Sequence, residues 1–259
     1  MIEKIKLIRN VGLAVLLIAV TFSCASGRVQ VGSDECAGLS GSADSYLNSG
    51  DIEYDRRNMY GALENYKKAL CKAPRSVNVH LSMGMALASL DRLDEALAHT
   101  DYILKELNPD SIAALTNKGL FFQKAGRFNE AKRIHLEILK NRPSDGPALL
   151  NLGLVEHQLG NDREAVRRFE EFLKLYPRNV MGLSNLAAIY SGMGEFEKAE
   201  ELFRRSLSID PDDYATHQNL ANHYVRIKRF DLAARHYSRA CSQGLQRACE
   251  DARWARSQQ

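Results

Sequence analysis

The sequence predicts an all-α solenoid, in which about six helix pairs follow one another and a C-terminal capping helix ends the array. Five of the six prolines fall 35, 34, 34 and 34 residues apart, at Pro74, Pro109, Pro143, Pro177 and Pro211. A small residue and an alanine twelve residues after it recur with the same spacing. A fixed period of this length is the signature of stacked supersecondary units and not of one compact domain.

Three columns of the repeat predict how the two helices of a pair meet. The small-residue column is Gly50, Gly84, Gly119, Gly153, Ala187 and Ala221, and the alanine column is Ala62, Ala96, Ala131, Ala165, Ala199 and Ala233. Four residues after each alanine stands Tyr66, Thr100, His135, Phe169, Phe203 or Tyr237. We expect the small residue to let the second helix approach and the ring to fill the remaining gap. Each proline then follows a second helix, which it cannot continue.

This pattern resembles the tetratricopeptide repeat family, most completely from Asn151-Leu152-Gly153 to Pro177 and from Asn185-Leu186-Ala187 to Pro211. The resemblance implies a right-handed superhelix whose first helices line a concave, protein-binding face. Thr100 and His135 depart from the family's aromatic position, and Leu245 stands where the last repeat would have a proline. The expected repeats are residues 43–76, 77–111, 112–145, 146–179, 180–213 and 214–247, with a cap helix at 248–259.

The first 23 residues predict a secretory signal, because Lys4, Lys6 and Arg9 precede an apolar run from Val11 to Phe22. The run is short for a membrane-spanning helix, which needs roughly 20 apolar residues; an uncleaved anchor is an alternative. Residues 24–42 are rich in glycine and serine and predict a flexible tether.

The end of the signal resembles the lipobox of bacterial lipoproteins, which implies that Cys24 carries a lipid, although Thr21 and Phe22 depart from that motif. The residue after the cysteine is Ala25, which by resemblance to sorting signals implies an outer-membrane lipoprotein facing the periplasm. The alternative is a soluble exported protein, cut after Ala25 or Gly27.

The four remaining cysteines form an even set once Cys24 is lipidated. Cys36 precedes the first helix and Cys71 lies near the end of the second, so that an antiparallel hairpin would bring the two thiols together. Cys241 and Cys249 would bridge the last second helix to the cap helix, with a spacing that resembles cysteine-rich Sel1-like repeats. The alternative is that these thiols are buried and unpaired.

Charge and motifs argue against several classes of function. The net charge is +3, of which the first ten residues contribute +2, so the rest of the chain is nearly neutral and gives no reason to expect nucleic acid, whose binding requires a basic stripe. None of the seven histidines pairs at the i, i+4 spacing of a helical metal site; His80 and His217 share a repeat position, which favours packing. No phosphate loop, nucleophile elbow or carboxylate cluster is present. We therefore expect no enzyme, metal, cofactor or small-molecule substrate.

Two rows of first-helix residues are expected to face the groove. The row after the small-residue column is Asp51, Met85, Leu120, Leu154, Ala188 and Asn222, and the row four residues earlier is Leu47, Leu81, Thr116, Leu150, Ser184 and Gln218. Their apolar middle suits an apolar strand or the apolar face of a partner helix; the alternative is that they pack against the neighbouring helix. Gln218 occupies the place where a carboxylate clamp would need lysine, which disfavours that binding mode.

The overall organisation resembles the pilotin lipoproteins of type IV pilus assembly, which implies an outer-membrane secretin as the partner. The alternative is an envelope adaptor that docks peptidoglycan hydrolases or proteases at the membrane. Fold analogy does not decide between these functions.

Overall fold

The computed structural model describes residues 36–259, and every regular element in that part is a helix. The predicted signal at residues 1–23, the candidate lipidation site Cys24 and most of the predicted tether lie outside the described residues. None of the described helices is both long enough and apolar enough to cross a bilayer.

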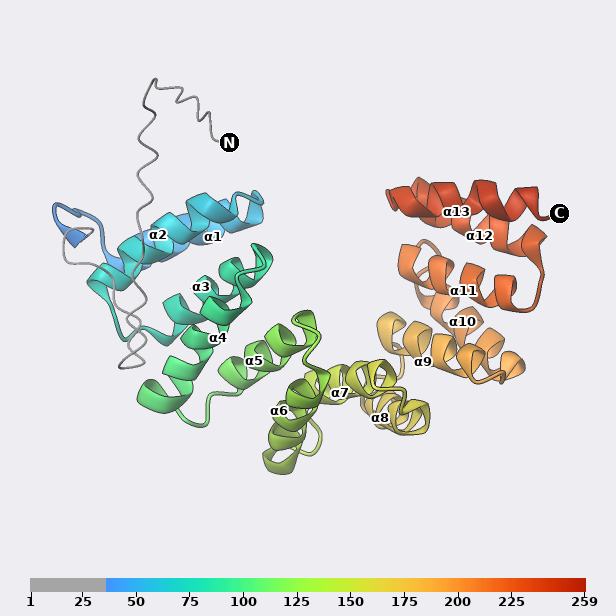
Figure 1. Ribbon diagram of the computed structural model, residues 1–259, viewed down its shortest axis with the longest axis horizontal. Helices are drawn as coiled ribbons and strands as arrows, with labels where there is room; N and C mark the ends of the chain where they lie inside the picture. Colours follow the sequence, from blue (N-terminus) through green and yellow to red (C-terminus); the bar gives the residue numbers. More distant parts are fainter. Residues whose placement is uncertain (1–35) are drawn as a thin grey trace, which may run out of the picture.

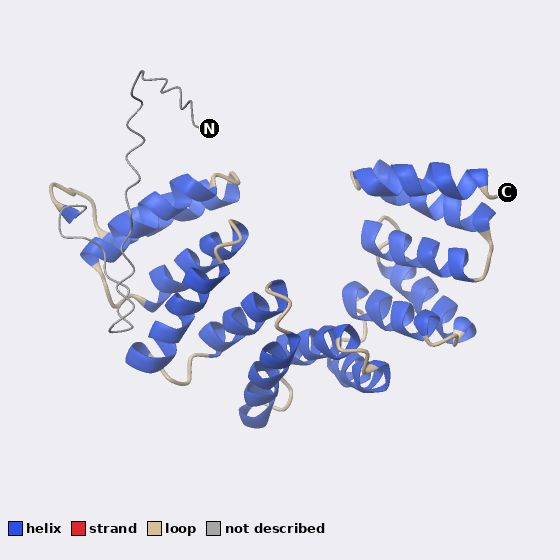
Figure 2. Ribbon diagram, in the orientation of Figure 1, coloured by secondary structure: helices blue, strands red, loops and turns tan. Residues whose placement is uncertain are grey.

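Twelve of the described helices form six consecutive pairs (Figures 1 and 2). The pairs are α1 (Ala43–Asp55) with α2 (Met59–Lys72), α3 (Val77–Ser89) with α4 (Leu93–Tyr102), α5 (Ile112–Lys124) with α6 (Phe128–Asn141), α7 (Gly146–Gln158) with α8 (Asp162–Leu175), α9 (Val180–Gly192) with α10 (Phe196–Ile209), and α11 (Tyr214–Arg226) with α12 (Phe230–Ser242). A thirteenth helix, α13 (Gln246–Ser257), packs on α12 and begins two residues before the predicted start of the cap.

A capping side chain at a fixed place in each repeat starts the first helix of every pair. The six caps are Ser42, Ser76, Ser111, Asp145, Asn179 and Asp213, and each accepts a hydrogen bond from the backbone N–H three residues later. Such a side chain satisfies one of the backbone donors that a helix start leaves unpaired. The cap after each inter-repeat turn therefore starts a new first helix 34 or 35 residues after the start of the previous one.

The one irregular spacing among the prolines has a local structural cause. Pro74 and Pro109 are 35 residues apart, and α4 passes into a π-helical segment, η2 (Ile103–Leu107), before Asn108. The Asn108 N–H bonds the carbonyl of Ile103, five residues back. A π-turn accommodates one extra residue without breaking the helix, so the insertion is absorbed before it reaches the next pair.

The pairs stack into an arc with the first helices on its inner side. Successive first helices contact one another from α1 to α11, whereas no contact of similar extent joins successive second helices within residues 36–259. Figure 1 shows α5 and α7 inside the curve relative to α6 and α8. The tips of the arc are the α1–α2 pair and the α12–α13 pair, on the same side of the central repeats.

Rings from the second helices pack directly on the small-residue column. A Cβ added to Gly119 would lie 2.6 Å from the His135 ring, and one added to Gly153 would lie 2.8 Å from the Phe169 ring. In the second repeat Thr100 has no ring to offer, and the nearest atoms to a Cβ on Gly84 belong to Phe121 of the next repeat, at 3.4 Å. The aromatic position therefore fills the space over the glycine itself.

Disulfides close both ends of the array. Cys36 is bonded to Cys71, which ties the segment before α1 to the end of α2. Cys241 is bonded to Cys249, which joins α12 to α13. The first bond closes a separation of 35 residues and the second one of 8 residues. Both pairings are those that the sequence analysis considered.

Candidate functional site

The two predicted groove rows lie on the first helices, and most of their side chains reach solvent. Eleven of the twelve residues are partly or fully exposed, and Asp51 and Asn222 are the most open. Ser184 differs, because it is buried and its hydroxyl accepts a hydrogen bond from the Asn219 amide at 3.0 Å. Ser184 therefore belongs to the packing between α9 and α11 and is not available to a partner.

Several side chains of the two predicted groove rows pack partly against the core and are partly exposed. Leu47 and Met85 pack against the buried cluster of the first repeats, and Leu150, Leu154 and Ala188 pack against that of the fourth and fifth repeats. Their other sides remain partly exposed. Part of each side chain therefore packs against neighbouring helices, as the alternative interpretation of these rows expects. The exposed part still gives the inner face an apolar middle.

The polar ends of the first row have a structural partner. The Tyr66 hydroxyl donates to Asp51 Oδ1 at 2.8 Å, and the Tyr237 hydroxyl donates to Asn222 Oδ1 at 2.5 Å. Burial, together with the hydrogen bond to Asp51, raises the pKa of the Tyr66 phenol. The fourth and fifth repeats have Phe169 and Phe203 at the ring position, and the matching row residues are Leu154 and Ala188. The row therefore has a polar residue where the ring position of the same repeat is a tyrosine, whose hydroxyl bonds it.

Met181 is a groove residue outside the two predicted rows. It lies three residues before Ser184 and seven before Ala188, which places all three on one face of α9. Its side chain is 57% exposed, more than any predicted leucine of the two rows. The sequence could have indicated Met181, because the inner face extends one turn further toward the start of each first helix.

A cleft of about 860 Å³ lies away from these rows, beside the α7–α8 turn. Its lining comes from α6, the end of α7, the start of α8 and the α9–α10 turn, and includes Lys132, Leu136, Glu156, Arg163, Arg168 and Met193. No sequence motif pointed to it. The residues that form it come from three consecutive repeats, so its position depends on the stacking of the pairs.

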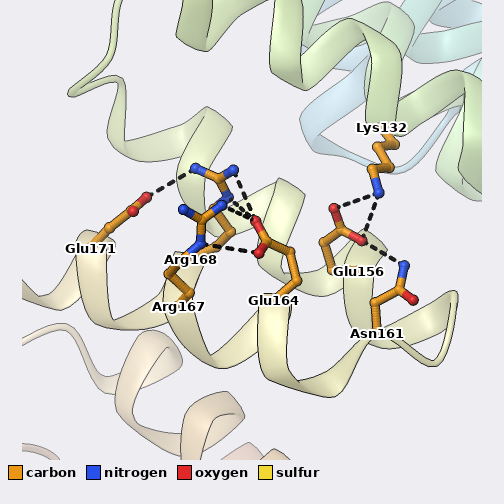
Figure 3. A network of polar contacts seen from close by, with 7 residues as sticks. All are labelled: Lys132, Glu156, Asn161, Glu164, Arg167, Arg168 and Glu171. Atoms are coloured by element: carbon orange, nitrogen blue, oxygen red, sulfur yellow. Dashed lines mark hydrogen bonds and ion pairs between the residues drawn. The ribbon is translucent and has the colours of Figure 1, made fainter.

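The charged side chains of this cleft are largely paired with one another (Figure 3). Glu156 is only 1% exposed, and its carboxylate accepts from Lys132 Nζ at 2.9 and 3.1 Å and from Asn161 Nδ2 at 2.9 Å. Arg168 spans Glu164 and Glu171 on α8. Because the Lys132 bond crosses from α6 to α7, the network links the third repeat to the fourth.

Within residues 36–259, no group of three or more His, Cys, Asp and Glu side chains is arranged to hold a metal ion. Two pairs of histidines are nevertheless in direct contact. His80 Nδ1 lies 2.8 Å from His99 Nδ1, and His217 Nδ1 lies 2.9 Å from His236 Nδ1. The first histidine of each pair also bonds a proline carbonyl, Pro74 or Pro211. The shared repeat position of His80 and His217 is thus occupied by packing side chains.

Comparisons with known proteins agree on the kind of repeat. Residues 77–101, 147–179 and 180–243 match three family models, each described as a tetratricopeptide repeat. No curated protein matches the sequence at a significant level.

Solved structures of similar fold come from several sources. PilF of Pseudomonas aeruginosa superposes with a TM-score of 0.66 and 19% identity, covering 84% of this chain and 97% of that one. A tetratricopeptide repeat protein of Parabacteroides merdae gives 0.61 and 18%, covering 82% and 98%. A chain of the Cut9–Hcn1 hetero-tetramer of the APC/C gives 0.69 and 16%, covering 83% of this chain and 42% of that one.

These likenesses concern the fold. Helix pairs of the family's length, stacked as in those structures and matched by three family models, identify this chain as a member of the tetratricopeptide repeat family of protein-binding scaffolds.

Proposed function

We propose that this scaffold is an exported, lipid-anchored assembly factor of the pilotin kind, whose concave groove holds an apolar segment of an outer-membrane secretin. The observation that carries the proposal is the partly exposed apolar middle of the inner face, where Met85, Leu120, Leu150, Leu154 and Met181 follow one another over four repeats. A secretin subunit in transit has apolar strands to shield, and such a groove suits them.

Three further features support the proposal. The predicted signal and Cys24 would place the chain at the envelope membrane. The superposition on PilF covers 84% of this chain and 97% of that one, so the number of stacked repeats is similar. The two disulfides are compatible with an oxidising compartment such as the periplasm.

Deleting the gene in the native host and measuring secretin multimers in outer-membrane fractions tests the proposal. We expect multimers to fall and secretin monomers to accumulate, with recovery on complementation by the wild-type gene. Unchanged multimers would eliminate the proposed role.

Complementation with groove variants connects the effect to this surface. Met181→Glu places a charge in the groove at a 57% exposed position and should fail to restore multimers. Met193→Glu makes the same change outside the groove, at a 36% exposed position in the α9–α10 turn, and should restore them. Equal behaviour of the two variants would separate the function from the groove.

Recovery of cell-wall enzymes, and not a secretin, with the protein from detergent-solubilised envelopes would favour the alternative function of a docking adaptor.

A further inference from the structure

The C-terminal end of the solenoid differs in charge from the rest of the chain. Residues 214–259 contain eight Lys and Arg residues against three Asp and Glu residues, a net charge of +5, whereas the whole chain carries only +3. The remainder of the protein is thus slightly acidic. This excess does not follow from the tetratricopeptide pattern, which concerns small, apolar and aromatic positions.

Part of this charge gathers around two aromatic rings at the α11–α12 turn. Trp254 of α13 meets Phe230, the first residue of α12, with the ring centroids 5.9 Å apart and the planes nearly perpendicular. Arg226 ends α11, Lys228 and Arg229 lie in the adjoining turn, and Arg253 precedes Trp254 on α13; all four are exposed. We call these six residues the basic edge.

Few of the cations of the basic edge are paired with a carboxylate of this chain. Arg229 pairs with Asp231 at 3.2 Å, and both side chains are about half exposed. Among residues 36–259 there is no carboxylate within ion-pair distance of Arg226, Lys228 or Arg253. Trp254 itself is 46% exposed. The edge therefore presents three uncompensated cations beside a half-exposed indole.

We propose that the basic edge docks on an anionic phospholipid surface, with its Arg and Lys side chains at the phosphate headgroups and the Trp254 ring in the interfacial layer. Basic residues near an anionic leaflet and tryptophan at the membrane interface are the two elements that such contacts use. A protein partner would call for a larger buried apolar centre than one indole edge, and the 860 Å³ cleft lies at other repeats.

The position of the edge in the arc supports a membrane contact. The α1–α2 and α12–α13 tips lie on the same side of the central repeats (Figure 1). A chain attached to a membrane at Cys24, which precedes α1 in the sequence, could rest the α12–α13 tip on the same surface, leaving the groove between two points of contact. This geometry rests on the membrane attachment in the proposed function, but not on the identity of the partner.

The chain carries its own reporter for this contact, because Trp254 is its only tryptophan. The full-length protein is mixed with vesicles of phosphatidylcholine alone or with added phosphatidylglycerol, and Trp254 emission is recorded. We expect a blue shift only with phosphatidylglycerol, quenching by lipids brominated in the acyl chain, and loss of both effects at high salt. Insertion of the N-terminal apolar segment would not by itself produce this signal.

Charge reversal tests which side chains are responsible. Each basic residue near an anionic surface changes the partition by roughly five-fold, so Arg226→Glu/Lys228→Glu/Arg253→Glu should weaken the vesicle affinity on the order of 100-fold. The matched control, Arg133→Glu/Lys140→Glu/Arg178→Glu, changes the total charge equally at exposed positions of the central repeats and should bind nearly as the wild type.

An unshifted Trp254 spectrum with phosphatidylglycerol vesicles, an equal shift with neutral vesicles, or equal losses in both triple variants would overturn the proposal. A shift produced by an acidic protein but not by vesicles would do the same. Since no partner protein is present in the vesicle assay, its failure is distinguishable from failure of the secretin role.

Discussion

The two histidine pairs, in which His80, His99 and His217 are buried and His236 is half-buried, are the least expected feature at the scale of single residues. The proline carbonyl can only accept, so Nε2 of His80 and of His217 carries hydrogen. In the neutral state Nδ1 of each then accepts from Nδ1–H of its partner, His99 or His236. Burial, and then the neighbouring His80, lower the pKa of His99 to about 3. Burial, and then His217, lower the pKa of His236 to about 4.

These shifts predict that acid destabilises the fold. In the unfolded chain an imidazole regains a pKa near 6.5, so between that pH and the folded pKa the unfolded state binds more protons. The stabilisation is complete above about pH 6.5 and is lost progressively as the pH falls, down to about 4 for His236 and about 3 for His99. At pH 5 we expect His99 alone to account for a loss of roughly 1–2 kcal/mol.

Urea unfolding at pH 7.5 and pH 5 measures this effect, and His99→Asn, which keeps a donor near the Nδ1 position without titrating, should show a smaller pH dependence. A midpoint that is the same at both pH values in the wild type would contradict the assignment.

The buried Glu156 carboxylate makes a second prediction at this scale. Lys132→Ala removes its cross-repeat partner and leaves a buried acceptor less satisfied, which should lower the free energy of unfolding by about 1–3 kcal/mol. Lys198→Ala breaks a Lys–Glu pair whose members are 61% and 38% exposed and should change stability little. Chemical denaturation of both variants checks this; similar costs would show that the Glu156 network is no stronger than a surface pair.

At the scale of the element, helix pairing was predictable and its local adjustments were not. The fixed spacing of prolines, alanines and small residues predicts the order and pairing of the helices, because each column has one packing role. The extra residue between Pro74 and Pro109 was visible, but several turns could have absorbed it. Only the packing of Ile103, which is fully buried, indicates why η2 does so.

The glycine column predicts opposite effects of one substitution at two positions. Gly153→Ala would place a Cβ 2.8 Å from the Phe169 ring, so we expect a loss of about 1–3 kcal/mol from overpacking. At Gly84 the nearest atom is 3.4 Å away, and Gly84→Ala should be neutral or stabilise by up to about 1 kcal/mol, because alanine costs less entropy in a helix. Thermal unfolding of both variants distinguishes them, and a loss at Gly84 equal to that at Gly153 would refute the difference in packing.

The end disulfides give a prediction for the terminal helices. The loop closed by Cys241–Cys249 is short, and a bond of this kind stabilises by roughly 2–4 kcal/mol. Reduction should therefore loosen α13 before the central pairs unfold, which hydrogen exchange would detect as faster exchange in residues 246–257. Uniform loss of protection along the chain would mean that the cap does not fray separately.

At the scale of the whole molecule, the sequence predicted the apolar middle of the inner rows but not the hydrogen bonds and burial of individual side chains in them. The apolar middle follows from Leu120, Leu150 and Leu154, whose side chains remain partly exposed. The hydrogen bonds of Asp51 and Asn222 could not be predicted from their own positions. Each bond comes from a tyrosine hydroxyl fifteen residues away on the partner helix. Ser184 was assigned to the surface for the same reason, since its burial depends on the neighbouring α11.

The arc gives these side chains a common direction. First helices contact one another while second helices spread apart, so curvature concentrates the inner rows and exposes Met181 among them. Binding by such a surface depends on the shape of several repeats together, and single substitutions at its rim should matter less than a charge placed in its middle.

Photo-crosslinking from the middle of the groove, in living cells, tests the central claim most directly. With a photoreactive amino acid at position 181 we expect a crosslink to the secretin, and with the same probe at position 193, in the α9–α10 turn, we expect none. Crosslinks to the secretin from position 193 alone, or from position 181 only to other envelope proteins, would contradict the account.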